Sequence, residues 1–264
     1  MINLKNKIIV IIGGSGLLGG EFLYSAIESG AKVINLDLET QNKNGEKIHS
    51  ISDNYFEIYC DITNEKNILK VANLIKEKFS YIDGLVNFAS INPQPDQISN
   101  TQLENMSIGQ WIVDLNVGLT GAFLVLKYIG KIISENKNGG SIVLISSDLG
   151  IIAPDQRLYE TNTPDTKDGK KPISYSAVKF GVIGLSKYVA TYWAEKNVRS
   201  NVICPGGVFN GQNIEFTKKV ETRIPLGRMA RKDEFNSALI WLLSDSSSYV
   251  NGAVIPIDGG RTAW

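Results

Sequence analysis

Several residue types are scarce in this chain of 264 residues, and each scarcity excludes a class of function. The single histidine, His49, lies in a polar stretch, which argues against a zinc site and against a Ser-His-Asp hydrolase. We therefore expect no bound metal. The two cysteines, Cys60 and Cys204, each follow an apolar strand-like run. We expect two free, buried thiols in a reducing cytoplasm.

Net charge and long apolar runs are lacking as well. The chain has 27 Lys and Arg against 27 Asp and Glu, so no global positive field attracts nucleic acid. Net charge does not address a local basic patch. No uninterrupted apolar run reaches the ~18 residues that indicate a membrane span. The first strand, 7–12, begins too early to leave room for a secretory signal. We expect a cytoplasmic protein that binds neither nucleic acid nor membrane.

What the chain has is a regular alternation of apolar strand-like runs and helical segments. Such runs predict a parallel sheet with helices on both faces. We expect an α/β fold, a Rossmann-like doubly wound sheet of about seven strands, in a single domain covering 1–264. The expected strands are 8–12, 32–37, 55–60, 84–88, 141–146, 198–204 and 253–257, and the expected helices are 17–28, 65–79, 108–134 and 174–195.

A glycine-rich turn lies between the first strand and the first helix. Gly13 permits the tight turn, Gly16 lets the backbone approach a pyrophosphate, and Gly19 lets helix and strand pack closely. The helix N-terminus adds amide donors and a positive dipole. The turn therefore predicts a dinucleotide site, and its other expected cofactor contacts are Ser15, Leu17 and Leu18.

An acidic residue, Asp37, ends the second strand, eighteen residues after Gly19. Its carboxylate can accept both ribose hydroxyls of the adenosine and would repel a 2′-phosphate, and no Arg or Lys follows directly. We therefore expect NAD(H) rather than NADP(H). Asp61, followed by Ile62, ends the third strand; it either lies near the adenine or caps the next helix.

Tyr175 and Lys179 lie four residues apart on a predicted helix and so share one face. A free tyrosine has a pKa near ~10 and is no base at neutral pH. A neighbouring ammonium favours the phenolate and lowers that pKa. The pair is therefore a candidate proton donor or acceptor for an alcohol or carbonyl.

With these residues in place, the chain resembles the short-chain dehydrogenase/reductase family over nearly its whole length. Asn116 matches the helix asparagine of the family's catalytic tetrad, and the second serine of Ser146-Ser147 matches its serine. Further matches are the run Asn87-Phe88-Ala89-Ser90 after the fourth strand, the turn Cys204-Pro205-Gly206-Gly207-Val208 beside the nicotinamide, and the ending Asp258-Gly259-Gly260.

The resemblance implies a division of labour among the four residues. Tyr175 passes the proton, Ser147 hydrogen-bonds the substrate oxygen, Lys179 lowers the tyrosine pKa and holds the nicotinamide ribose, and Asn116 supports a water linking Lys179 to solvent. Tyr175 and Lys179 therefore count among the cofactor contacts too. The further contacts it implies are Asn87, Ala89, Ser90, Pro205, Gly206 and Val208.

Three departures from the small enzymes of this family bear on the substrate. Leu17 stands where they keep glycine, as in the sugar-nucleotide epimerase and dehydratase branch. The segment 154–172 looks like an insertion at the active-site rim, where Lys167, Lys170 and Lys171 could meet an anion; a solvated loop is the alternative. Asp148 follows Ser147, matching half of an acidic pair that those dehydratases use. We expect Ser147, Asp148 and Asn210 to contact a polar, sugar-like substrate beneath a lid over 208–224.

The C-terminal stretch resembles short-chain dehydrogenases of bacterial surface-sugar pathways, including flagellin-glycan synthesis. The resemblance also implies a homodimer or homotetramer, and we expect Trp264 to be buried against its own or a neighbouring subunit. The expected function is an NAD(H)-dependent oxidoreductase that interconverts a secondary alcohol and a ketone. The alternatives are a sugar dehydratase or epimerase with tightly bound NAD, and a non-catalytic nucleotide-binding module.

Overall fold

The computed structural model describes residues 2–40, 45–92, 101–159 and 169–264. In these residues eight strands form one sheet, in the order β3-β4-β2-β1-β5-β6-β7-β8. All neighbours pair in parallel except β3, which runs antiparallel to β4. The strands are β1 (Ile8–Ile12), β2 (Lys32–Asp37), β3 (His49–Ser52), β4 (Tyr55–Tyr59), β5 (Gly84–Asn87), β6 (Gly140–Ile145), β7 (Val198–Pro205) and β8 (Val254–Ile257).

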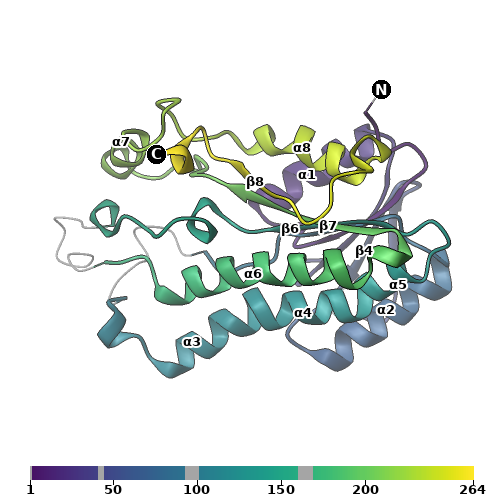
Figure 1. The fold of residues 1–264 in the computed structure, drawn as a ribbon. Coiled ribbons are helices and arrows are strands. Elements are labelled where there is room, and N and C mark those ends of the chain that lie inside the picture. Colours follow the sequence, from purple (N-terminus) through teal and green to yellow (C-terminus); the bar gives the residue numbers. More distant parts are fainter. Residues whose placement is uncertain (1, 41–44, 93–100, 160–168) are drawn as a thin grey trace.

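Helices cover both faces of the sheet, with α1 and α8 on one face and α2 to α6 on the other (Figure 1). Two π-helical turns, η3 (Asn116–Thr120) and η4 (Leu126–Gly130), join α3, α4 and α5 into one rod. The helices are α1 (Leu17–Glu28), α2 (Glu65–Phe79), α3 (Ile108–Leu115), α4 (Gly121–Val125), α5 (Lys131–Ser134), α6 (Ile173–Tyr192), α7 (Ile214–Glu221) and α8 (Asn236–Leu243).

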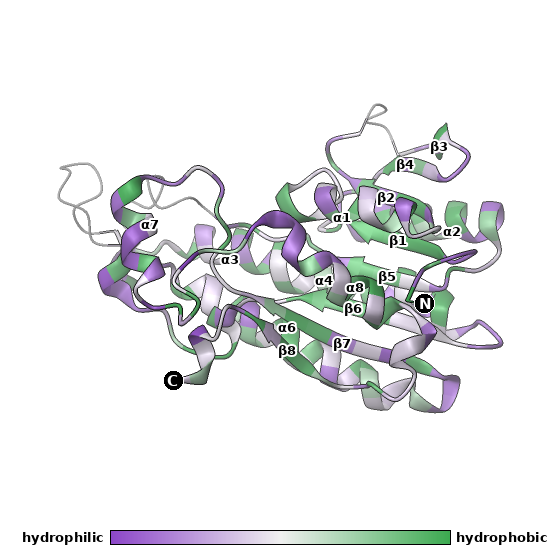
Figure 2. Cartoon of the chain, turned by 90° about the horizontal axis from the view of Figure 1, so that it is seen from above, coloured by the Kyte–Doolittle hydropathy of each residue, from purple (hydrophilic) through white to green (hydrophobic). Residues whose placement is uncertain are grey.

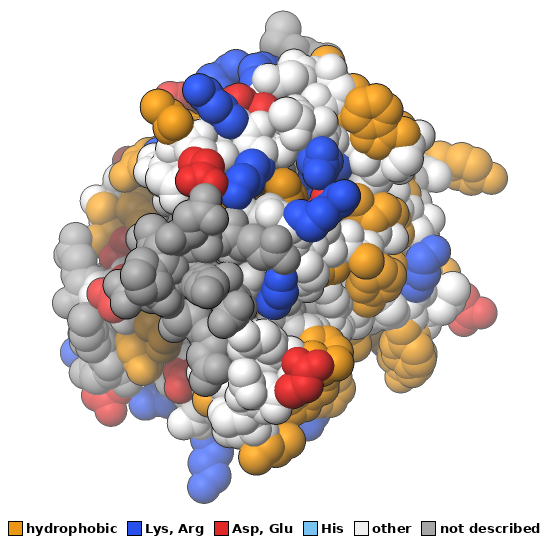
Figure 3. Space-filling view, turned by 90° about the vertical axis from the view of Figure 1, so that its left-hand side faces the viewer, with side chains coloured by type: hydrophobic (Ala, Val, Ile, Leu, Met, Phe, Trp, Pro, Cys, Tyr) orange, Lys and Arg blue, Asp and Glu red, His pale blue; other side chains and the backbone are white. Residues whose placement is uncertain are grey.

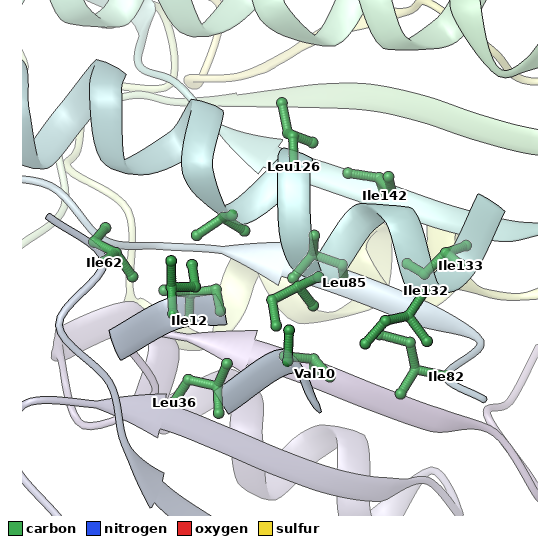
Figure 4. Close-up of a cluster of buried hydrophobic side chains, with 14 of the residues drawn as sticks. Val10, Ile12, Leu36, Ile62, Ile82, Leu85, Leu126, Ile132, Ile133 and Ile142 are labelled. Carbon is green, nitrogen blue, oxygen red and sulfur yellow. The ribbon is translucent and has the colours of Figure 1, made fainter. Parts of the chain in front are cut away.

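The central strand β1 shows why the sheet is buried on both sides. Ile8, Val10 and Ile12 point into the cluster shared with α2, α4 and α6, part of which Figure 4 shows. Ile9 and Ile11 point the opposite way, into the cluster shared with α1 and α8. Side chains alternate along a strand, so only a continuous apolar run satisfies both layers. The central strands β1, β5 and β6 are accordingly mostly hydrophobic (Figure 2).

The predicted fold class is confirmed, and one strand was missed. Strand β3, with the sequence HSIS, is a short antiparallel edge strand whose residues are half-buried or exposed. It has no apolar run, and its partner lies on a single side, so nothing in its pattern predicts a strand. The prediction of free, buried thiols at Cys60 and Cys204 is confirmed.

The rod over Ile108–Ser134 is, by length and composition, apolar enough to cross a membrane. This helix contains no uninterrupted apolar run of that length, because polar residues such as Asp114 and Lys127 interrupt the sequence. Leu124, Val125 and Ile129 are buried in the core cluster beneath the sheet. The structure therefore uses this helix as part of the layer that covers the sheet.

The topology also decides where a ligand can bind. Between β4 and β5 the chain returns from near one edge of the sheet to its middle, where β5 pairs with the free side of β1, so the loops at the carboxyl ends of β1 and β5 leave in opposite directions. Such a switch point leaves a crevice at the carboxyl edge of a doubly wound sheet.

Candidate active site

The glycine turn between β1 and α1 has the backbone that a dinucleotide site needs. Gly13 has φ +77°, a conformation that favours glycine. A Cβ added to Gly19 would lie 2.1 Å from the carbonyl oxygen of Gly13, so only glycine allows this approach. Gly16 precedes α1 without a side-chain cap. Because Gly16 has no side chain that could cap the first amides of α1, these amides fit a pyrophosphate.

Two residues of β2 hold this turn in place. The Oδ1 atom of Asn35 accepts a hydrogen bond from the Gly14 amide at 3.1 Å, and the Oδ2 atom of Asp37 accepts one from the Ser15 amide at 2.9 Å. Sequence reasoning missed Asn35, which is buried in the middle of an apolar strand. The signal in the sequence was a polar residue in the middle of an otherwise apolar strand, where a buried side chain needs a hydrogen-bond partner.

Asp61 lies two residues after β4, where its carboxylate accepts hydrogen bonds from the amide and hydroxyl of Thr63. The N-cap of α2 is Asn64, so the interpretation of Asp61 as a helix cap is wrong. Its contact with adenine stays a prediction, as does that of Ile62, which is buried in the core. At the end of β5, Asn87 accepts a hydrogen bond from the Ala89 amide at 3.1 Å.

One cavity of about 320 Å³ brings the glycine turn together with three of the four expected catalytic residues. Ser147 follows β6, and Tyr175 and Lys179 lie on α6. Pro205 at the end of β7 lines the cavity, as do Gly206 and Val208 after β7 and Ser90 after β5. Ser146 donates its hydroxyl hydrogen to the Lys179 carbonyl at 2.7 Å and so fixes α6 against β6. Ser147 remains the serine available to a substrate.

The environment of Tyr175 differs from the sequence prediction. Burial raises the pKa of this phenol to about 12; a hydrogen bond with Ser147 opposes the rise, and the charge of Asp148 adds to it. Lys179 Nζ lies 5.5 Å from the centre of the Tyr175 ring. Because burial outweighs the opposing effects, the predicted lowering of the tyrosine pKa is not found in the protein without cofactor.

Lys179 is itself buried, and desolvation lowers its pKa to about 8. Its Nζ atom donates a hydrogen bond to the carbonyl of Ile145, at the end of β6, at 3.2 Å. This bond directs the ammonium along the cavity wall, between the tyrosine and the end of the sheet.

Asn116 does not line the cavity. It begins the π-helical turn η3 and is exposed. π-Helical turns are rare and occur frequently at functional sites. The catalytic role of Asn116 stays a prediction that rests on the resemblance.

Asp148 and Arg261 form a buried ion pair beside Ser147. Arg261 begins the final turn η10 (Arg261–Ala263), and its Nε lies 2.8 Å from Asp148 Oδ2. Asp148 Oδ1 accepts hydrogen bonds from the Ser147 hydroxyl and the Leu149 amide. Burial raises the pKa of Asp148 despite these partners. Sequence reasoning missed Arg261, because 113 residues separate the two partners.

The expected rim and lid pack against each other where the structure describes them. Arg223 donates a hydrogen bond to Asp155 at 3.0 Å, and Leu158 and Tyr159 pack with Val220 of α7. Asn210 lines the cavity from the segment before α7. Residues 160–168 of the expected insertion, including Lys167, lie outside the described residues.

Lys171 is the unexpected member of this site. It is 7% exposed, it lines the cavity, and its Nζ lies 3.9 Å from the centre of the Tyr175 ring. The Nζ atom donates a hydrogen bond to Asn92 Oδ1 at 2.6 Å. Burial lowers the pKa of Lys171 to about 8. The sequence suggested an anion contact for this lysine, but it did not indicate that the lysine lies over the tyrosine.

Comparison with known proteins gives matches along the whole chain. Residues 7–160 match the family model for short chain dehydrogenase, and residues 165–262 match that for enoyl-(acyl carrier protein) reductase. A 3-oxoacyl-[acyl-carrier-protein] reductase of Thermotoga maritima is 32% identical, over 98% of this chain and 99% of the relative. A D-threitol dehydrogenase of Mycolicibacterium smegmatis is 29% identical, over 98% and 94%.

The crystal structure of a short chain dehydrogenase from Leptospira borgpetersenii with bound NAD+ superposes with a TM-score of 0.85. It is 30% identical, over 98% of this chain and 94% of that one. These matches cover the glycine turn, the sheet and the helix that carries Tyr175.

Proposed function

This chain belongs to the short-chain dehydrogenase/reductase family, and from that premise we propose that it is an NAD(H)-dependent oxidoreductase that interconverts a secondary alcohol and a ketone on a small polar, sugar-derived substrate. The observation that carries the proposal is the single cavity in which Ser147, Tyr175 and Lys179 face the glycine turn. The similarity to a D-threitol dehydrogenase supports a polyol-like substrate. The surface-sugar pathway stays a prediction.

Asp37 supports NAD(H) over NADP(H). Its carboxylate lies beside the glycine turn, where it already binds the Ser15 amide. Within the part of the chain that the structure describes, Asp37 forms no ion pair with a lysine or arginine. A 2′-phosphate at this position would meet an uncompensated negative charge. The bound NAD+ of the Leptospira protein agrees with this choice.

The residues of the cavity suit reduction of a carbonyl and the reverse reaction. The cofactor, when bound, supplies or accepts the hydride. Tyr175 is a neutral phenol at neutral pH because burial raises its pKa to about 12, so it donates a proton to the carbonyl oxygen as negative charge develops there. The Ser147 hydroxyl, which donates to Asp148 Oδ1 in this structure, would turn to donate its hydrogen bond to the same substrate oxygen. Lys179 would hold the ribose hydroxyls of the cofactor next to Tyr175.

The dehydratase alternative needs a free acid beside Ser147. Asp148 is instead paired with Arg261 and accepts two further hydrogen bonds. Its carboxylate therefore orients the Ser147 hydroxyl and positions the loop after β6. We propose Asp148 as a positioning residue rather than an acid of the reaction.

The test is a panel of polyols and sugar derivatives, assayed with NAD+ and NADP+ by absorbance of the reduced nicotinamide. Tyr175→Phe should lower kcat/KM by about 10² to 10⁴, while its Kd for NADH stays within about threefold. The matched control, Tyr192→Phe, lies exposed on the same helix and should stay active. Undiminished turnover by Tyr175→Phe, or no turnover of any compound by a wild type that binds NADH, contradicts the proposal. Equal use of NADP+ contradicts the role of Asp37.

A further inference from the structure

Lys171 is a buried cation that the reaction itself does not require. It is four residues before Tyr175, and its side chain lies over the tyrosine ring at the cavity wall. The family function needs one lysine beside the tyrosine, and Lys179 already occupies that position. A second buried ammonium at the reacting residue therefore calls for another partner.

The backbone around Lys171 is held from two sides, so this placement is built into the fold. The side chain of Gln156 accepts a hydrogen bond from the Lys171 amide at 2.8 Å and donates one to the Lys171 carbonyl at 3.3 Å. The Thr101 hydroxyl bonds both the amide and the carbonyl of the preceding Lys170. These bonds fix where the Lys171 side chain enters the cavity.

The charge of Lys171 is not neutralised by the described protein. Its Nζ atom has one hydrogen bond, to the neutral amide oxygen of Asn92, whereas an ammonium carries three donors. Among residues 2–40, 45–92, 101–159 and 169–264, no carboxylate forms an ion pair with it. The carboxylate that faces it, Asp148, is bound to Arg261 and Ser147. The pKa of about 8 leaves Lys171 predominantly charged at neutral pH.

A buried ammonium without a counter-ion is unfavourable unless an anion joins it. We propose that Lys171 receives a carboxylate of the substrate, so that the substrate class is a hydroxy or keto sugar acid; this inference rests on the proposed oxidoreductase function. Because Lys171 lies over the ring whose hydroxyl passes the proton, the carboxylate lies only a few bonds from the reacting carbon.

A carboxylate fits this position better than a phosphate. A phosphate monoester carries a charge of about −1.5 to −2 at neutral pH and three acceptor oxygens, and it is usually met by several cations. Two other cations line the cavity: Arg261 is already paired with Asp148, and Lys179 is assigned to the cofactor ribose. The charge of Lys171 is therefore the one left for a substrate anion, and a single positive charge matches one carboxylate. Lysine and arginine side chains also lie across the end of the molecule seen in Figure 3, where they favour the approach of an anion.

The experiment compares substrates that share a carbon skeleton and differ in charge. D-Gluconate is paired with D-glucitol and D-tartrate with D-threitol, and D-glucitol 6-phosphate tests a phosphate. The variants are Lys171→Met, which removes the charge but keeps the length, and Lys171→Arg, which keeps the charge. Lys232→Met, at an exposed position, is the control for loss of one lysine. Thermal melting of each variant verifies that it folds.

Lys171→Met should lower kcat/KM for the acids by about 10- to 100-fold, mostly through KM, because a bond made equally to the substrate and the transition state affects binding. The neutral polyols should change by less than about threefold. Lys171→Arg should retain most of the activity on acids, and Lys232→Met all of it. An equal loss of kcat/KM on acids and polyols, or a loss in kcat alone, would mean that Lys171 acts on Tyr175 rather than on a substrate carboxylate, and it overturns the inference.

Binding separates this inference from the proposed function. Acids are titrated into the NADH complex and followed by nicotinamide fluorescence. Failure of every acid to bind at millimolar concentration, or a preference for the polyol or the phosphate, overturns the inference while the oxidoreductase function stands. Acid binding that depends on Lys171 in a protein without turnover supports the inference and overturns the proposed function.

Discussion

At the scale of single residues, burial governs the chemistry of this site. Tyr175, Lys171 and Lys179 are all perturbed chiefly by desolvation, which disfavours the charged form of each group. Desolvation raises the pKa of the phenol and lowers that of both ammonium groups. The Tyr175 phenol therefore keeps at neutral pH the proton that it would donate to a carbonyl, although Lys171 and Lys179 lie 3.9 and 5.5 Å from its ring centre.

The first prediction concerns the titration of Tyr175 in the protein without cofactor. Because its pKa is raised to about 12, Tyr175 should remain a phenol throughout the neutral range and ionise only in strong alkali. The measurement is the tyrosinate absorbance of the wild type minus that of Tyr175→Phe across pH. A difference that develops near neutrality would show that Lys179 acidifies the phenol even before a cofactor binds.

At the scale of elements, the glycine turn and α1 act as one unit. Two glycines follow each other at the start of α1, yet their surroundings differ. A Cβ on Gly19 would overlap the Gly13 carbonyl, whereas a Cβ on Gly20 would have its nearest neighbour, the Gly14 carbonyl oxygen, at an ordinary 3.5 Å. The pair provides a matched test of the packing between β1 and α1.

Gly19→Ala should weaken NADH binding by about 10-fold or more and lower the melting temperature, because the turn must shift to relieve the overlap. Gly20→Ala should bind NADH normally and should stabilise the helix by up to about 1 kcal/mol, since alanine favours helix over glycine. Fluorescence titration and thermal melting measure both effects. Equal behaviour of the two variants would show that the close approach is unimportant.

At the scale of the whole molecule, the outer faces of the rod and of α6 expose large apolar side chains. These two helical segments are adjacent (Figure 1). Such an apolar face is typical of a protein interface. The exposed residues include Ile112, Val113, Phe123, Phe180, Tyr188 and Tyr192. Trp264 is 80% exposed, so the prediction that it is buried against its own chain is wrong. Its burial against a neighbouring subunit stays a prediction.

We expect a homodimer or homotetramer of the 29.0 kDa chain. The double variant Phe123→Asp/Phe180→Asp should dissociate it by introducing charges on both helices of the face. Tyr24→Asp, on the exposed side of α1, is the control and should leave the assembly intact. Sedimentation velocity gives the mass. A monomeric wild type, or an unchanged mass in the double variant, would contradict this interface.

Much of the architecture was predictable because local patterns carry it. The apolar runs at β1, β2 and β6 are buried on both faces, and their positions follow from the local sequence pattern. Helices α1 and α2 begin and end where expected. The edge strand β3 was missed because a half-exposed strand stabilised by one neighbour needs no apolar pattern. The spacing of Tyr175 and Lys179 was sufficient to place them together.

The sequence by itself determined the layer arrangement, the glycine turn and the pairing of Tyr175 with Lys179, since these follow from local patterns, whereas Ser147 was assigned through the family resemblance. Only the tertiary structure decided which charges meet in the cavity. Asp148 pairs with Arg261 and Lys171 lies over Tyr175 because separate loops converge at the carboxyl edge of the sheet. The pKa values were also decided by the tertiary structure, because desolvation depends on everything packed around a group and not on its neighbours in the sequence.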